Sequence, residues 1–245
     1  MPNPVFSFIL PFYKQSDQLT AVLAEFESRL NGQPQSFELI AVINGIEDQA
    51  EPMITNVIQE SPRVIKISLR GSGWGMAVRA GMADAKGEYV CYTNTARTKV
   101  DELIKMLPYA LISKNTVIKA TRTKRSNWVR KWTSILFNLE NRFILGTPAW
   151  DVNATPKIVP RGILQFLKIE ENGDLIDAEL LYGCFLQSIS IIEIPIQHIE
   201  RRSGKSTTGF KSAIKMFTGI IRIKRERHGK KNQSKIKEDI AGSSS

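Results

Sequence analysis

The sequence predicts an α/β fold in which helices cover both faces of a mostly parallel β-sheet. Short apolar segments rich in β-branched residues alternate with segments whose apolar residues recur at spacings of three and four, the helical period. The strand-like segments are continuously apolar, as expected for strands of a parallel sheet buried on both faces. With 245 residues, 42% of them hydrophobic, the chain can form one substantial core.

The first 120 residues repeat a strand–helix unit. The helix expected at 17–30 has apolar residues at Leu19, Val22, Phe26 and Leu30, which share one helical face. The strands expected here are 5–10, 37–43, 63–69 and 89–93, and the helices between them are 17–30, 51–60 and 75–86. Residues 100–111 and 116–120 continue this pattern.

The regularity weakens beyond residue 121. Gly146 and Pro148 are expected to end a helix at 127–145 that carries Trp128 and Trp132. The later expected elements are an extended connection at 155–161, a helix at 177–186, a strand at 191–196 and a basic amphipathic helix at 208–227. The predicted organisation is a globular domain at 1–207, the amphipathic helix at 208–228 and a disordered polar tail at 229–245.

The net charge of +10 is unevenly distributed along the chain. Residues 201–237 contain 13 Lys or Arg residues and one acidic residue, Glu226. This asymmetry predicts an anionic partner, either a lipid surface or a nucleic acid, although a solvated basic tail has the same composition. The two phenylalanines of this stretch, Phe210 and Phe217, fall on the apolar side of the expected amphipathic helix and are not arranged for base stacking, so we expect the lipid surface and no nucleic acid.

Two cysteines, Cys91 and Cys184, lie in apolar surroundings far apart in the sequence. They are expected to be buried free thiols in a reducing, cytoplasmic compartment. The N-terminus has no basic region before its short apolar run, so we expect no signal peptide. We also expect no membrane-spanning helix, since the best apolar stretch, 216–223, is interrupted by Arg222.

Several catalytic motifs are absent from the sequence. With two histidines, no H-E-x-x-H and no paired C-x-x-C, a zinc site is not expected. Neither a G-x-S-x-G elbow nor a Walker lysine loop occurs. The glycines at 71, 73 and 75 resemble a dinucleotide fingerprint, but Met76 replaces its third glycine. We interpret them as glycines of a tight turn and of close backbone packing at a helix start.

Short segments in a fixed order resemble the family 2 glycosyltransferases, above all the dolichyl- or polyprenyl-phosphate sugar synthases. The segments are F-I-L-P-F-Y-K at 8–14, E-L-I-A-V-I-N-G at 38–45, G-W-G-M-A-V-R-A-G at 73–81 and G-E-Y-V at 87–90, followed by D-A-E-L-L at 177–181, E-I-P-I at 193–196 and R-R-S-G-K-S at 201–206. Their common order over about four fifths of the chain makes the resemblance specific.

The resemblance implies a single GT-A domain that binds a nucleotide sugar above the strand ends. It implies sugar transfer to a lipid-linked acceptor of the polyprenyl-phosphate type, or to a polysaccharide, by a protein attached peripherally to the cytoplasmic face of a membrane. Two alternatives stay open: a catalytically impaired homologue that binds a nucleotide sugar or a partner without turnover, and a scaffold whose basic tail binds nucleic acid.

The resemblance also implies a donor site. Its residues would be Pro11, Phe12, Tyr13, Asn44, Arg79, Asn94, Arg97, Arg202 and Lys205. The family binds Mg²⁺ or Mn²⁺ through D-x-D-x-Q, which aligns here with N-T-A-R-T at 94–98, where neither carboxylate is present. A hard cation prefers anionic oxygen, so we assign no metal and expect cationic side chains to neutralise the diphosphate.

The remaining roles implied by the resemblance concern catalysis and the acceptor. Asp177 and Glu179 correspond to the family's acid pair and are the predicted catalytic residues. They are two positions apart on a helix and therefore do not share a face, and Asp177 also suits a helix start. Arg122, Arg125 and Arg130 are the predicted acceptor-binding residues, beside tryptophans that suit a membrane interface.

Overall fold

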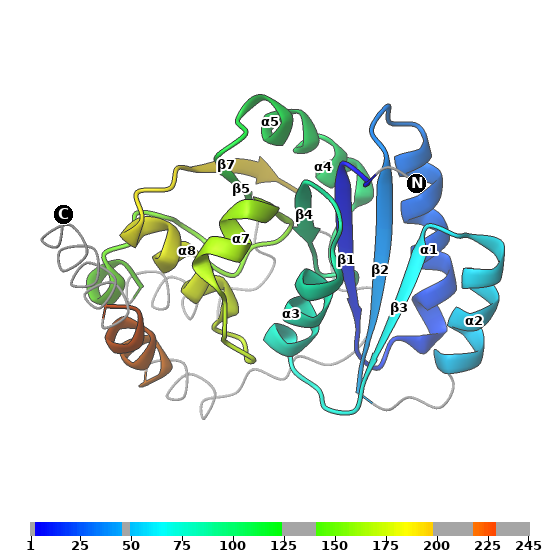
Figure 1. Cartoon of the computed structure of the whole chain (residues 1–245), viewed down its shortest axis with the longest axis horizontal. Helices are drawn as coiled ribbons and strands as arrows, with labels where there is room; N and C mark the ends of the chain where they lie inside the picture. The colour runs from blue at the N-terminus through cyan, green and yellow to red at the C-terminus, as the bar shows by residue number, and fades with distance from the viewer. Residues whose placement is uncertain (1–2, 46–49, 124–140, 198–217, 229–245) are drawn as a thin grey trace, which may run out of the picture.

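The computed structural model describes residues 3–45, 50–123, 141–197 and 218–228, and it confirms the predicted α/β fold (Figure 1). Seven strands form one sheet in the order β3-β2-β1-β4-β6-β5-β7. The strands are β1 (Phe6–Phe12), β2 (Phe37–Asn44), β3 (Val64–Leu69), β4 (Tyr89–Tyr92), β5 (Val117–Arg122), β6 (Lys157–Pro160) and β7 (Ile191–Ile196).

Helices connect the strands and cover both faces of the sheet (Figure 1). They are α1 (Ser16–Asn31), α2 (Ala50–Glu60), α3 (Trp74–Asp84), α4 (Val100–Ile104), α5 (Leu107–Ile112), the π-helical turn η1 (Asn141–Leu145), α7 (Arg161–Leu167), α8 (Ile176–Leu186) and a C-terminal helix at 218–228. Within these described ranges, no helix combines the length and the apolar content needed to cross a bilayer.

The sheet is parallel from β3 through β2 and β1 to β4. Phe6 of β1 pairs with Phe37 of β2 on one side and with Tyr89 of β4 on the other. Strand β6 runs antiparallel to both β4 and β5, whereas β7 is parallel to β5. The extended connection expected at 155–161 is therefore a short sheet strand, which joins the two parallel parts.

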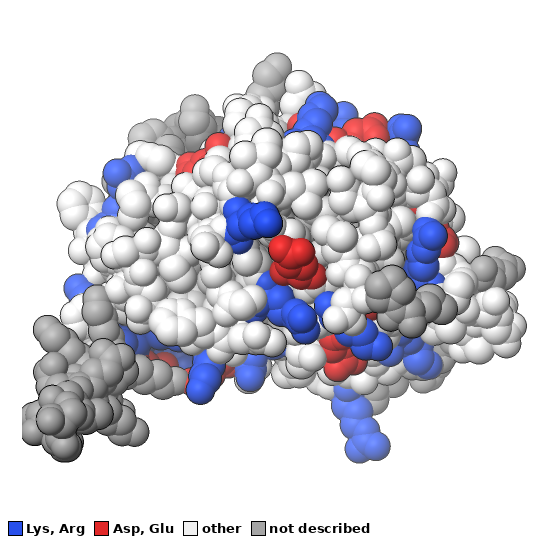
Figure 2. Space-filling model, turned by 45° about the horizontal axis from the view of Figure 1, so that its top comes forward, with Lys and Arg blue, Asp and Glu red and all other residues white. Residues whose placement is uncertain are grey.

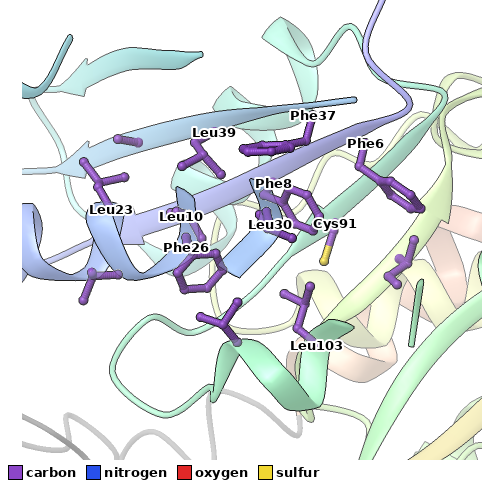
Figure 3. Close-up of a cluster of buried hydrophobic side chains, with 14 of the residues drawn as sticks. Phe6, Phe8, Leu10, Leu23, Phe26, Leu30, Phe37, Leu39, Cys91 and Leu103 are labelled. Carbon is purple, nitrogen blue, oxygen red and sulfur yellow. The ribbon is translucent and has the colours of Figure 1, made fainter. Parts of the chain in front are cut away.

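One face of the sheet packs against α1, α2, α4 and α5. Figure 3 shows Phe8 and Leu10 of β1 beside Leu39 of β2, with Phe26 of α1 and Leu103 of α4 packed over them. These five side chains are at most 1% exposed. Cys91 belongs to the same cluster, and both cysteines are buried free thiols, as predicted.

The opposite face packs against α3, α7 and α8. Ile9, Val42 and Tyr92 point to this side, where Val78 of α3 and Leu180 of α8 cover them. A third cluster joins the outer side of α8 to the C-terminal helix through Leu181, Ile220 and Ile223. The C-terminal helix is thus packed onto the domain.

The structure differs from the sequence predictions at several short elements. Residues 100–111 form two helices, with Pro108 in the first turn of α5. Helix α7 was not expected, and residues 141–145 form a π-helical turn. The other parts of the helices expected at 127–145 and 208–227, namely 127–140 and 208–217, lie outside the described residues, as does the tail from 229.

The glycines at the start of α3 allow close packing, as the sequence analysis proposed. A Cβ atom at Gly75 would lie 2.6 Å from the carbonyl oxygen of Gly173 and 2.7 Å from that of Glu171, which are both backbone atoms. At Gly73 it would lie 2.9 Å from the carbonyl oxygen of Asn172. The start of α3 therefore lies directly against residues 171–173.

Replacing Gly75 by alanine should lower the free energy of unfolding by about 1–3 kcal/mol, because backbone would have to move to admit the methyl group. Gly162 in α7 is the matched control, since a Cβ atom there has no neighbour within 4 Å. Gly162→Ala should leave stability unchanged or raise it by up to about 1 kcal/mol through helix propensity. Urea denaturation of both variants measures this, and equal stabilities would contradict the packing argument.

Candidate functional site

The strand order reverses at β1, and this reversal defines the candidate site. The chain builds β1, β2 and β3 toward one edge and then returns to place β4 on the other side of β1. In open α/β sheets, ligands bind at such a reversal, in the crevice outside the carboxyl ends of the strands. The carboxyl ends of β1, β2 and β3 lie at the lower edge of the view in Figure 1. The hydroxyl of Thr95, after β4, donates to the carbonyl of Pro11 at 3.1 Å and to Gln15 at 3.3 Å.

The proline-aromatic segment at the end of β1 contributes one exposed ring, that of Tyr13. Pro11 is buried and Phe12 is 2% exposed in the core, which leaves no side-chain surface at Phe12 for a nucleotide. Tyr13 is 38% exposed. The ammonium group of Lys14 lies 5.5 Å from the centroid of the Tyr13 ring. Of the predicted aromatic contacts, Tyr13 is therefore the one that a donor can reach.

Asn44, at the end of β2, is bonded to the start of α3. Its amide nitrogen donates to the carbonyl of Gly73 at 3.2 Å, and its amide oxygen accepts from the N–H of Gly73 at 3.0 Å. A Cβ atom at the next residue, Gly45, would lie 3.6 Å from Ser72 and 3.8 Å from the ring of Tyr13. Tyr13, Asn44 and the start of α3 thus lie together on one side of the candidate site, the position at the strand reversal that we call the crevice, although both polar groups of Asn44 already have partners.

The segment that replaces the metal-binding motif is a compact turn. The side-chain oxygen of Asn94 accepts from the N–H of Ala96 at 3.1 Å, and the backbone N–H of Asn94 donates to the hydroxyl of Thr155 at 3.3 Å. The hydroxyls of Thr93 and Thr98 are 2.5 Å apart. Among the residues that the structure describes, no group of three or more His, Cys, Asp or Glu side chains gathers. The turn offers a divalent cation no carboxylate, so these residues do not fit the family's metal ion.

A buried ion pair between Asp177 and Lys157 lies at the end of β4, next to Tyr92. Asp177 of α8, 2% exposed, accepts from the ammonium of Lys157 at 2.5 Å, from the hydroxyl of Tyr92 at 2.8 Å and from the indole of Trp74 at 3.2 Å. Burial lowers the pKa of Lys157, and Asp177 opposes this shift. Burial also raises the pKa of Tyr92 well above its usual value, and Asp177 adds to the shift. Both carboxylate oxygens of Asp177 are thus engaged by donors inside the protein.

Lys157, Lys119 and Glu193 form a row of charged side chains across the neighbouring strands β6, β5 and β7. Lys119 on β5 pairs in register with Lys157 on β6 and with Glu193 on β7. Its ammonium donates to Glu193 at 3.2 Å and to the carbonyl of Trp150 at 2.6 Å. Burial lowers the pKa of Lys119 to about 8, with a further contribution from Lys157. Lysines on otherwise apolar strands were a sequence signal for this row, which the sequence analysis missed.

Other predicted site residues also contact groups of the domain. Arg122, a predicted acceptor residue, forms an ion pair with Asp151, while Arg125 and Arg130 lie outside the described residues. Glu179 forms an ion pair with Arg227 at 2.5 Å, and Arg79 donates to the carbonyl of Glu170 at 2.8 Å. Arg97 belongs to the 94–98 turn beside Asn94, as expected. Arg202 and Lys205 lie outside the described residues. The substrate roles predicted for all of these residues stay predictions.

The C-terminal helix does not present its apolar side outward. Ile220 and Ile223 are buried against α8, and Arg222 and Arg227 pair with Glu171 and Glu179. On the face that Figure 2 brings forward, Lys and Arg side chains are interspersed with Asp and Glu. In residues 218–228, the amphipathic pattern therefore reflects packing onto the domain.

Replacing one partner of the Lys157–Asp177 pair should destabilise the protein more than replacing both partners together. Lys157→Met or Asp177→Asn alone should lower the free energy of unfolding by about 3–5 kcal/mol, because one charge stays buried without its partner. The double variant should be at least about 2 kcal/mol more stable than the sum of the single losses predicts. Chemical denaturation of the four proteins completes the cycle, and additive losses would show that the two charges do not stabilise each other.

Comparison with known proteins identifies the family of this chain. The family model described as glycosyl transferase family 2 matches residues 7–165. Undecaprenyl-phosphate 4-deoxy-4-formamido-L-arabinose transferases of Aeromonas hydrophila subsp. hydrophila and Proteus mirabilis are 23% and 25% identical over 219 residues. Each match covers 88% of this chain and 66% of the relative, so the chain spans just under two thirds of the length of these relatives.

Solved structures share the fold. Glucosyl-3-phosphoglycerate synthase from Mycobacterium tuberculosis, in complex with Mn²⁺, UDP-glucose and phosphoglyceric acid, superposes with a TM-score of 0.65 at 18% identity. The match covers 92% of this chain and 80% of that chain. The same enzyme with Mn²⁺, UDP and phosphoglyceric acid gives a TM-score of 0.67 at 16% identity, over 91% and 78% of the two chains. The match to the family model covers more than half of the chain, and the chain belongs to the family 2 glycosyltransferases, with a single domain of the GT-A fold.

Proposed function

We propose that this protein transfers a sugar from a nucleotide-diphosphate donor to a lipid-linked phosphate of the polyprenyl type. The observation that carries the proposal is the reversal of strand order at β1, where Thr95 of the turn after β4 donates to the carbonyl of Pro11 near the end of β1. Membership in family 2 supports the reaction class. The names of the relatives support an undecaprenyl-phosphate acceptor.

The donor would lie along the carboxyl edge of the sheet. Tyr13 and the wall formed by Asn44 and Gly73 would hold the nucleoside, and the diphosphate would lie above the Asn94–Thr98 turn. Arg97, together with Arg202 and Lys205, would neutralise the charge of the leaving diphosphate. Because the turn does not fit a dication, no step of this mechanism depends on one.

An ionised lipid phosphate suits a site whose predicted acids, Asp177 and Glu179, are both held in ion pairs. Its oxygen attacks the anomeric carbon, the bond from that carbon to the diphosphate oxygen breaks, and the electron pair leaves with the nucleoside diphosphate. A hydroxyl acceptor would need a base, whereas a phosphate oxygen is already anionic. This choice agrees with the buried contacts of Asp177 and Glu179, which both form ion pairs. The catalytic role predicted for this pair is not needed in the proposed reaction.

The acceptor places the proposed reaction at a membrane surface. We propose peripheral attachment at the cytoplasmic face, where the excess Lys and Arg residues of 201–237 would contribute electrostatic attraction to anionic lipid. Acceptor contacts at Arg122, Arg125 and Arg130 belong to this proposal.

A second candidate function is nucleotide-sugar binding without turnover. The absence of both carboxylates from residues 94–98 favours it, because a dication normally stabilises the departing diphosphate in this family. The two candidates share the crevice and differ in whether the sugar is transferred.

Calorimetry and a transfer assay on the full chain distinguish these functions. A panel of nucleotide sugars is titrated with Mn²⁺ and with EDTA, and transfer to undecaprenyl phosphate is followed in vesicles containing anionic lipid. We expect one donor to bind with an affinity that changes less than about threefold between Mn²⁺ and EDTA, with product formed in both.

Other outcomes assign the protein differently. Binding without product indicates the second candidate function. Binding or transfer that needs Mn²⁺ would reject the cation-based mechanism. Absence of binding across the panel would reject donor recognition at this crevice.

A further inference from the structure

The connection between α7 and α8 lies between the donor crevice and the C-terminal helix. Residues 170–173 of this connection contact α3 on one side. On the other side they contact Glu179 of α8, which is bonded to Arg227 of the C-terminal helix. We call residues 170–173 the bridging segment.

The bridging segment is fixed tightly to the start of α3. The N–H of Met76 donates to the carbonyl of Asn172 at 2.9 Å. Arg79 donates to the carbonyl of Glu170 at 2.8 Å and to the side chain of Asn172 at 2.5 Å. Gly75 has no room for a Cβ atom against Gly173. Because the two backbones are in direct contact, displacement of the bridging segment must displace the start of α3.

The start of α3 is also the wall of the crevice. Gly73 is held at the end of β2 by both polar groups of Asn44. Ser72, one residue earlier, is near Gly45, which in turn is near the exposed ring of Tyr13. The position of residues 72–74 therefore sets the distance between this wall and the loop after β1.

Glu179 of α8 accepts hydrogen bonds from the backbone of the bridging segment. Its carboxylate accepts from the N–H groups of Glu170 at 3.0 Å and Glu171 at 2.8 Å. Arg227 donates to the same carboxylate at 2.5 Å and 3.1 Å, and also to the backbone carbonyls of Leu167 and Lys168. The side chains of Arg227 and Glu179 are 10% and 7% exposed. A buried carboxylate that accepts from two backbone N–H groups and from two nitrogens of one arginine is rigidly held.

We infer that Arg227 and Glu179 are positioning residues for the donor crevice, through which the C-terminal helix fixes the bridging segment and, with it, the start of α3. The inference rests on the proposed function for its effect on the donor. Its structural part, the coupling of the C-terminal helix to residues 73–79, holds independently of any ligand. Removal of the arginine leaves Glu179 buried without its cation, and the two N–H contacts to the bridging segment weaken as the carboxylate moves toward water.

The test compares Arg227→Ala with Arg225→Ala in the full chain. Arg225 lies on the same helix with an exposed side chain, so both variants lose the same charge from the same element. Amide hydrogen exchange without ligand should rise at least fivefold at residues 73–79 and 170–173 in Arg227→Ala, while exchange in β2 stays unchanged. Arg225→Ala should match the unmodified chain at both places.

Donor measurements add a second readout. With the nucleotide sugar that the unmodified chain binds, Arg227→Ala should raise the KM or Kd at least fivefold and change kcat less than twofold. Glu179→Gln should shift the KM in the same direction. Arg227→Lys keeps the charge but not the two guanidinium contacts, and its KM should lie between those of the unmodified chain and of Arg227→Ala. Arg227→Lys replaces Arg227→Ala in these measurements if the alanine variant does not fold.

The outcomes separate the inference from the proposed function. Unchanged exchange at 73–79, in Arg227→Ala or in Arg227→Lys if that variant is used, would overturn the coupling. Raised exchange with unchanged donor affinity would overturn the positioning role. If the unmodified chain binds no nucleotide sugar, the proposed function fails, and the exchange experiment alone decides whether the C-terminal helix positions α3.

Discussion

Parallel strands cannot be joined by tight turns, and this constraint organises the molecule. Each connection from β1 to β4 must cross the sheet, so the carboxyl ends of these strands all lie on one edge. The return of the chain from β3 to β4 then places the turn after β4 beside the end of β1, where Thr95 donates to the carbonyl of Pro11. The crevice is thus a product of strand order, and the residues that follow each strand determine its chemistry.

The charges near this edge are mostly used within the protein. Lys157 and Asp177 form a buried pair, Lys119 and Glu193 extend it, and Arg122 pairs with Asp151. Such a row holds β4, β6, β5, β7 and α8 together and leaves the acid pair of α8 engaged. A reaction whose nucleophile carries its own negative charge suits this arrangement better than one that requires a base.

Sequence patterns predicted the alternating elements well, because period and apolarity are local properties. They also predicted that the residues after the parallel strands lie along one edge of the sheet, as they do for β1, β2, β3 and β4; that a ligand binds at this edge stays a prediction. Partners distant in sequence could not be foreseen: Asn44 is bonded to Gly73, and Glu179 to Arg227, 48 residues away. The sequence could not show that Phe12 is buried, because an aromatic residue at a strand end can face either the core or the crevice. Short β6 and α7 gave too few periods to be recognised.

The central claim is that a nucleotide donor occupies the crevice at the strand reversal. Amide hydrogen exchange of the full chain, with and without a nucleoside diphosphate in EDTA, tests it most directly. The account predicts slower exchange at residues 13–15, 44–45 and 94–98 and unchanged exchange at the opposite edge, around Lys86 and Arg161. Protection confined to that opposite edge, or protection that appears after Mn²⁺ is added and not before, would contradict it.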